Sequence, residues 1–226
     1  MDRAEALLSA PGSARRLLGI AGPPGAGKST LAARLVDELA ARHGRQPPLV
    51  GQAPMDGFHL PNAELRRRGL AGRKGAPETF DAAGYAALLA TLRADHPGEV
   101  AAPSFSRVLD EPVAGAHVIG PSVRLVLCEG NYLLLDTGDW ARVRACCHEV
   151  WYLSADADRT RPRLLARHRS GGRTPDEARA WVESNDLVNG RLVARTAARA
   201  DHLVDLAPVD LAPGDAAPGD LDSDLA

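Results

Sequence analysis

An eight-residue loop at positions 22–29 constrains the fold more than any other feature, because it matches the pattern G-x-x-x-x-G-K-[ST] at every fixed position. Its residues are Gly22, Pro23, Pro24, Gly25, Ala26, Gly27, Lys28 and Ser29. An apolar run, 16–21, precedes the loop and apolar residues recur at helical spacing after it, so the loop joins a buried strand to a helix. Glycines let the backbone N–H groups turn toward an anion, and the helix N-terminus adds partial positive charge. The pattern therefore predicts a phosphate-binding loop in an α/β fold.

Two side chains of this loop carry the expected chemistry. In loops of this pattern the lysine, here Lys28, reaches the β- and γ-phosphates of a nucleotide, and the hydroxyl of Ser29 binds Mg²⁺. Lysine is rare in this chain, since only Lys28 and Lys74 occur among 27 basic residues, which makes a chance match improbable. We expect residues 22–30, with Thr30 the last of them, to bind ATP and Mg²⁺. The alternative is an ordinary Gly/Pro turn before a helix.

Composition excludes several classes of partner. The formal net charge is −2, but six aspartates and no basic residue occur from Asp205 onward, so the rest of the chain is mildly basic and suits an anionic small molecule. Aromatic residues make up only 4%, too few for platforms that stack single-stranded nucleic acid. The three cysteines lack metal-ligand spacing, and no apolar run approaches a membrane span. We expect a cytoplasmic protein with a small-molecule substrate and no nucleic-acid or membrane partner; a homodimer stays open.

Apolar runs that alternate with helical patterns predict a parallel sheet with helices on both faces. Strands are expected at 16–21, 49–53, 123–128, 150–153 and 202–206, with two further short strands at 100–105 and 113–119. Helices are expected at 28–41, 62–69, 157–169 and 175–200, and after Asp81 as an N-cap. One domain would span 1–206, and the acidic, Pro- and Gly-rich stretch 207–226 is expected to be disordered.

Two acidic residues follow predicted strands and are candidates for catalysis. Glu129 ends the run 123–128, where a phosphate-binding-loop protein places the acid that holds Mg²⁺ directly or through water. Asp56 follows the second strand and precedes Gly57, a position from which a carboxylate can accept a proton from a substrate hydroxyl. Local sequence alone also allows simpler interpretations, a solvated acid for Glu129 and an Asx turn for Asp56.

Arginines are concentrated between residues 157 and 175. They are Arg159, Arg161, Arg163, Arg167, Arg169 and Arg173. Arg161 and Arg163 flank Pro162, which is unfavourable inside a helix and therefore favours a mobile lid. Guanidinium groups suit the dispersed negative charge on a transferring phosphoryl group. We assign Arg161 and Arg163 to catalysis and expect most of the others to be solvated.

Five segments, taken together and in order, carry a family resemblance. They are 22–30, Asp56-Gly57-Phe58, 68–81, Pro103-Ser104-Phe105-Ser106 and Leu127-Cys128-Glu129-Gly130-Asn131. Over residues 16–206 the chain resembles the pantothenate kinase, uridine kinase and phosphoribulokinase group of P-loop kinases, and within it the fructose transport system kinase-like branch. The resemblance implies a three-layer P-loop NTPase sandwich, with a five-stranded mainly parallel sheet and a small Arg-rich lid at about 157–175. It also implies that Asp56 is the catalytic base, that Glu129 serves magnesium and that one lid arginine contacts phosphate.

The matching segments also suggest residues on the acceptor side. His59 and Lys74 are assigned to substrate binding, as is Asn189, because it resembles the pantothenate kinase segment whose Asn meets the substrate. Arg107 falls where pantothenate kinases carry a His. A guanidinium there would suit an acidic or phosphorylated substrate through bidentate pairing.

The sequence as a whole predicts an ATP- and Mg²⁺-dependent phosphotransferase that acts on a hydroxyl of a small polar metabolite. Pantothenate-like acids, nucleosides and sugars all stay open as acceptors. The rival hypotheses are an ATP-binding regulator without an acceptor and an adaptor that holds nucleotide only for stability. A guanine-nucleotide switch is disfavoured, because neither Lys28 nor Lys74 is followed two residues later by an Asp.

Overall fold

The core is a five-stranded parallel sheet in the order β2-β5-β1-β6-β7. The computed structural model describes residues 1–12, 14–94 and 96–205. The sequence predicted this α/β fold, and all five strands lie within a few residues of their expected positions. The strands are β1 (Arg16–Ala21), β2 (Val50–Gln52), β5 (Leu125–Gly130), β6 (Glu149–Ser154) and β7 (His202–Asp205).

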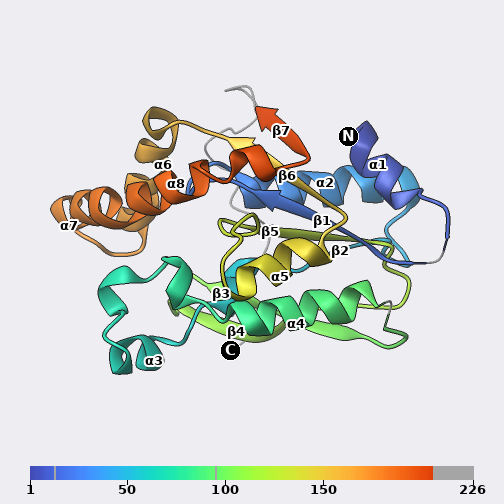
Figure 1. Cartoon of the computed structure of the whole chain (residues 1–226), viewed down its shortest axis with the longest axis horizontal. Coiled ribbons are helices and arrows are strands. Elements are labelled where there is room, and N and C mark those ends of the chain that lie inside the picture. The colour runs from blue at the N-terminus through green and yellow to red at the C-terminus, as the bar shows by residue number, and fades with distance from the viewer. Residues whose placement is uncertain (13, 95, 206–226) are drawn as a thin grey trace.

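Helices cover both faces of this sheet, so the expected three-layer arrangement is confirmed. Alternate residues of β1 point to opposite faces: Leu18 and Ile20 pack with α1 (Asp2–Leu8) and α2 (Lys28–His43). On the other face, Leu17 and Ala21 join the core formed with α4 and α5. Figure 1 shows α4 and α5 on the opposite side of β1 and β5 from α1 and α2. The bounds are Ala82–Arg93 for α4 and Asp139–Cys146 for α5.

The helix α5 was not predicted, because it is short and only Trp140 and Val143 of its residues are buried. The helix α4 begins as predicted, since the Asp81 side chain accepts a hydrogen bond from the backbone N–H of Gly84. Among the described residues, no helix is both long enough and apolar enough to span a lipid bilayer.

A β-hairpin lies outside the main sheet, beside α4 (Figure 1). Its strands, β3 (Val100–Ser106) and β4 (Glu111–Ile119), pair in antiparallel fashion with an irregularity between Ala102 and Ser104. The hairpin packs on the short turn Met55–Phe58, and a Cβ added at Gly57 would lie 2.3 Å from the carbonyl oxygen of Pro103. This close approach explains the glycine and brings the hairpin beside Asp56.

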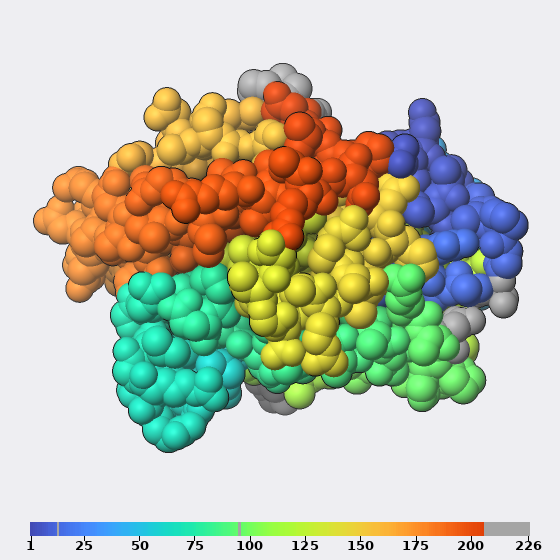
Figure 2. All heavy atoms as spheres, in the orientation of Figure 1, coloured from blue at the N-terminus to red at the C-terminus, as the bar shows by residue number. Residues whose placement is uncertain are grey.

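Residues 157–194 form a helical layer at one end of the molecule (Figure 1). It consists of α6 (Ala157–Ser170), α7 (Pro175–Trp181), a π-helical turn (Val182–Asp186) and α8 (Leu187–Ala194). Pro162 lies inside α6 without ending it, so the helix expected at 157–169 is continuous. Figure 2 shows this layer next to the segment that contains α3 (Asn62–Arg67). The predicted disordered stretch, 207–226, lies outside the described residues.

Candidate active site

The three acidic and basic groups expected to do the chemistry meet at one edge of the sheet. β1, β2 and β5 are parallel neighbours, so the segments that follow them leave the sheet at the same edge. The phosphate-binding loop follows β1, Asp56 comes shortly after β2, and Glu129 lies near the end of β5. The topology therefore brings together residues that are far apart in sequence.

The loop after β1 has the backbone that its glycines predict. Gly22 adopts φ 153°, and a Cβ there would lie 2.6 Å from the carbonyl oxygen of Leu153 on β6. Gly27 adopts the left-handed conformation at the N-cap of α2, which is 16 residues long. The loop thus places the N-terminus of a long helix behind the expected phosphate site, where its dipole favours an anion.

Lys28 is almost completely buried, with 8% of its surface exposed. Its ammonium group donates to the carbonyl oxygen of Pro23 at 3.1 Å and to Oδ1 of Asn131 at 2.7 Å. Burial lowers the pKa of Lys28, and the negative charges of Glu129 and Asp56 act in the opposite direction. The lysine is therefore held by the loop and by Asn131, within the electrostatic influence of the two carboxylates.

Ser29 and Glu129 are in contact, as their predicted common role requires. The Ser29 hydroxyl donates to Oε1 of Glu129 at 3.0 Å, and Glu129 is only 7% exposed. Burial, followed by the negative charge of Asp56, raises the pKa of Glu129 to about 7. The Ser29 hydroxyl on α2 and the Glu129 carboxylate on β5 are oxygen ligands of the kind that Mg²⁺ prefers. Mg²⁺ takes few protein ligands, and waters and phosphate oxygens complete its coordination. The described residues contain no cluster of three or more His, Cys, Asp or Glu side chains suited to a metal ion.

Asp56 lies in the short turn that the hairpin covers, and its charge acts on both Lys28 and Glu129. His59 Nδ1 lies 2.8 Å from the carbonyl oxygen of Asp56. Because a carbonyl only accepts, Nδ1 carries the proton and Nε2 is left as an acceptor. The His59 ring packs between Phe80 and Phe105, with centroids 4.0 and 4.5 Å away, and burial lowers its pKa.

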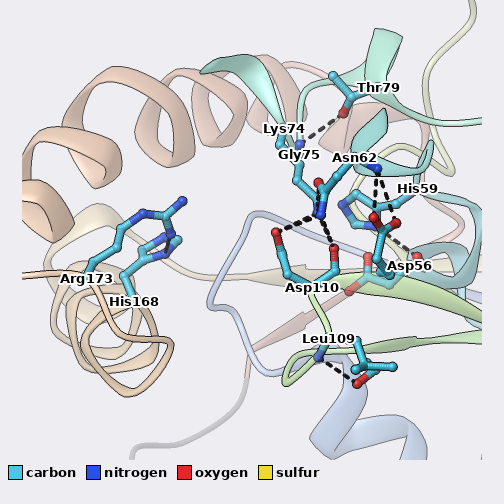
Figure 3. A network of polar contacts seen from close by, with 12 residues as sticks. Asp56, His59, Asn62, Lys74, Gly75, Thr79, Leu109, Asp110, His168 and Arg173 are labelled. Carbon is cyan, nitrogen blue, oxygen red and sulfur yellow. Dashed lines mark hydrogen bonds and ion pairs between the residues drawn. The ribbon is translucent and has the colours of Figure 1, made fainter. Parts of the chain in front are cut away.

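Lys74 is engaged with neighbouring protein groups, as Figure 3 shows. Its ammonium donates to Oδ1 of Asn62 at 2.7 Å and to the carbonyl oxygen of Asp110 at 2.6 Å, and lies 2.8 Å from the Asp110 carboxylate. It also lies over the ring of Phe105, 5.1 Å from the centroid. With 12% of its side chain exposed, Lys74 ties the hairpin end to the loop before α4. Its predicted contact with substrate stays a prediction.

Asn189 is buried on α8 and donates to Oδ1 of Asn185 at 3.2 Å. Asn185 in turn donates to the carbonyl oxygen of Lys74 at 2.6 Å. The next carbonyl, that of Gly75, accepts from the hydroxyl of Tyr132 at 2.5 Å. The Lys74–Gly75 backbone is thus held from two sides, and Asn189 supports it through Asn185.

The arginines of α6 are arranged by the period of the helix. Arg161 pairs with Glu183 at the surface. Arg163 donates to the carbonyl oxygen of Gly25 at 3.3 Å, and the positive charge of Arg167, one turn later, lowers the pKa of Lys28. Arg107, on the exposed turn of the hairpin, acts on Lys28 in the same direction. Arg163 therefore contacts the phosphate-binding loop and Arg161 contacts Glu183, while the charges of Arg167 and Arg107 act on Lys28.

Sequence reasoning did not single out Arg167 or Asn131. The helix expected at 157–169 places Arg163 and Arg167, four residues apart, on one face, and this spacing is the signal that could have identified Arg167. Asn131 lies two residues beyond Glu129, within the segment that carries the family resemblance, and its amide oxygen accepts from Lys28.

Comparisons with known proteins agree with this geometry. No family model matches the chain. It is 34% identical over 193 residues to "Putative uridine kinase C227.14" of Schizosaccharomyces pombe, covering 83% of this chain and 81% of the relative. A pantothenate kinase of Leifsonia xyli is 40% identical over 129 residues, 56% of this chain and 38% of that protein.

A solved structure from Silicibacter sp. TM1040, described as a "putative fructose transport system kinase", superposes with a TM-score of 0.79 at 36% identity. The match covers 90% of this chain and 97% of that one. The fold, the phosphate-binding loop and these relatives lead to the same assignment: the chain belongs to the P-loop small-molecule kinases of the pantothenate kinase and uridine kinase group.

Proposed function

We propose that this protein is an ATP-dependent kinase that transfers the γ-phosphate to a hydroxyl of a small polar metabolite. One observation carries the proposal: Ser29 bonds to Glu129, and the charges of Lys28, Glu129 and Asp56 are close enough to act on one another. A nucleotide switch needs the first three residues to hold nucleotide and metal, but it has no need for a base. The location of Asp56, beside them and under the hairpin, favours a second substrate.

Each group has a distinct task in such a reaction. Lys28 and the N-terminus of α2 bind the β- and γ-phosphates and offset their charge. Ser29 and Glu129 would hold Mg²⁺, which supplies Lewis-acid stabilisation of the phosphate oxygens when bound. Asp56 orients the acceptor hydroxyl and accepts its proton. Arg167, whose charge reaches both Lys28 and Asp56, would stabilise the transferring phosphoryl group between them.

The acceptor side is polar and mixed in charge. We assign to it the acceptor nitrogen of His59, the exposed guanidinium of Arg107 and the carboxylate of Asp56. This set suits a small metabolite with several hydroxyl groups, and Arg107 could add a contact to an acidic group on it. Pantothenate-like acids, nucleosides and sugars are the classes to test.

The proposal is tested by ADP release from Mg-ATP in the presence of pantothenate, uridine, cytidine, ribose, fructose and their phosphates. Asp56→Asn is the diagnostic variant, and Asp176→Asn, an exposed change on α7, is the matched control. We expect one compound to stimulate release, and Asp56→Asn to reduce that rate by about 10²-fold or more while ATP still binds.

Stimulation that persists in Asp56→Asn would refute the assigned base. If ATP binds and no compound stimulates release, the interpretation as an ATP-binding regulator gains support.

A further inference from the structure

The π-helical turn Val182–Asp186 contains two adjacent buried polar residues, Asn185 and Asp186, which bond to different parts of the site. Asp186 and Asn185 are 7% and 6% exposed, so both are buried. A π-helical turn costs hydrogen-bond geometry and often occurs at functional positions. Asn185 bonds to the backbone of Lys74 on the acceptor side, and Asp186 bonds to α6 on the phosphate side.

Asp186 is held in a defined orientation. One carboxylate oxygen lies 2.7 Å from Nε2 of His168, and Nδ1 of the same ring lies 2.7 Å from a guanidinium nitrogen of Arg173. Because a guanidinium only donates, Nδ1 accepts and Nε2 carries the proton that it donates to Asp186. The guanidinium of Arg173 also packs over Trp181, 4.2 Å from the ring centroid. Figure 3 shows His168 and Arg173 side by side, across from the Lys74 cluster.

The other oxygen of Asp186 faces Arg167. It lies 3.7 Å from Nη2 of Arg167, whose side chain is still 39% exposed. The arginine is therefore tethered on one side and open to a ligand on the other. Its charge acts on Lys28 and Asp56, the two groups between which a γ-phosphate would lie.

The turn leads into a helix that lies close to the phosphate-binding loop. It continues directly into α8, and a Cβ added at Gly190 on that helix would lie 3.8 Å from Cβ of Pro23. The helix that follows the turn is therefore a near neighbour of the loop that is expected to hold the phosphates.

We propose that Asp186 is a positioning residue that holds Arg167 toward the γ-phosphate. The π-helical turn also links this arginine to the Lys74–Gly75 backbone, through the hydrogen bond from Asn185. The inference rests on the proposed function only in requiring that the loop bind a nucleoside triphosphate. It does not require the acceptor to be known. Loss of the Asp186 carboxylate should therefore weaken binding of the third phosphate selectively. Binding of the nucleoside and of the first two phosphates should stay the same.

The test compares the dissociation constants of Mg-AMP-PNP and Mg-ADP by isothermal titration calorimetry. We expect Asp186→Asn to reduce the ratio of Kd for ADP to Kd for AMP-PNP by about fivefold to tenfold, the size of one weakened charge-assisted contact. The Kd for ADP and the melting temperature should change little. Asp186→Glu keeps the charge and should recover part of the ratio, and the exposed change Asp176→Asn should leave all three quantities unaltered.

A double-mutant cycle with Arg167→Gln separates positioning from general damage. If Asp186 acts through Arg167, Asp186→Asn has no further effect on the ratio in the Arg167→Gln background. Equal weakening of ADP and AMP-PNP, or additive effects in the cycle, would overturn the inference. Failure of the wild type to bind either nucleotide would instead refute the proposed function, so the two failures are distinguishable. Should Asp186→Asn not fold, Asp186→Glu is measured in its place, and we expect the same selective loss for AMP-PNP at a smaller size.

Discussion

Replacing Gly57 by alanine should damage both stability and catalysis, because the hairpin leaves no room for a side chain beside Asp56. An added Cβ would lie 2.3 Å from the carbonyl oxygen and 2.5 Å from the carbonyl carbon of Pro103. These are backbone atoms and cannot rotate away, so the hairpin must move by about 1 Å to reach ordinary contact. Gly57 is not among the residues with positive φ, so the whole cost is steric.

Overpacking of this kind costs about 1–3 kcal/mol. For a protein of this size, about 2 kcal/mol corresponds to a fall in Tm of about 4–8 °C. Gly72→Ala is the matched control, since nothing lies within 4 Å of a Cβ there and its φ is not positive. That change should be neutral or stabilise the protein by up to about 1 kcal/mol.

Thermal unfolding of the two variants and ADP release with the identified acceptor would test this prediction. We expect Gly57→Ala to melt below the wild type and to lose kcat, because Asp56 moves with the turn. If Gly57→Ala and Gly72→Ala melted at the same temperature, the packing of the hairpin on this turn, as described here, would be refuted.

Three shorter predictions concern single side chains. Lys28→Met should abolish turnover and weaken ATP binding while the fold is kept, since it removes a buried charge. Calorimetry with ATP measures the affinity and a melting curve checks the fold, and unchanged ATP affinity would contradict the prediction. Ser29→Ala should raise the Mg²⁺ concentration needed for half-maximal activity, and an unaltered Mg²⁺ titration would count against the Ser29–Glu129 site. Burial lowers the pKa of His59 in the folded state, so below about pH 6.5 the unfolded chain binds more protons and stability falls as pH falls. Melting temperatures between about pH 7 and pH 5.5 should therefore decline less in His59→Gln than in the wild type, and parallel curves would exclude this contribution.

Much of the site followed from order along the chain. A parallel sheet brings the ends of its strands to one edge, so a loop after β1, an Asp after β2 and a Glu near the end of β5 lie at the same edge of the sheet. The geometry of the residues agrees: Ser29 bonds to Glu129, and both carboxylates act on Lys28.

The sequence could not predict those contacts of the site that depend on how side chains and strands are oriented in the packed fold. The hairpin strands were found, but their antiparallel pairing and its irregularity at Ala102 depend on what they pack against. The choice between Arg161 and Arg167 depends on which face of α6 is turned to the loop, and the spacing of the arginines along the helix does not say which face that is. The partners of Lys74 come from Asn62 and Asp110, 12 and 36 residues away, and no local pattern marks them.

The sequence by itself determined the α/β fold, the phosphate-binding loop and the identity of the chemical groups, because these are encoded by local spacing, periodicity and composition. Tertiary structure alone decided how those groups are held. It brought the Asn131 amide into hydrogen-bond contact with Lys28, and it brought the charge of Arg167 near Lys28. It also gave Lys74 its protein partners, and it let Asn185 and Asp186 contact Lys74 and Arg167 from one turn. The physical reason is that hydrogen bonds and ion pairs between distant segments depend on orientations that only the packed fold defines.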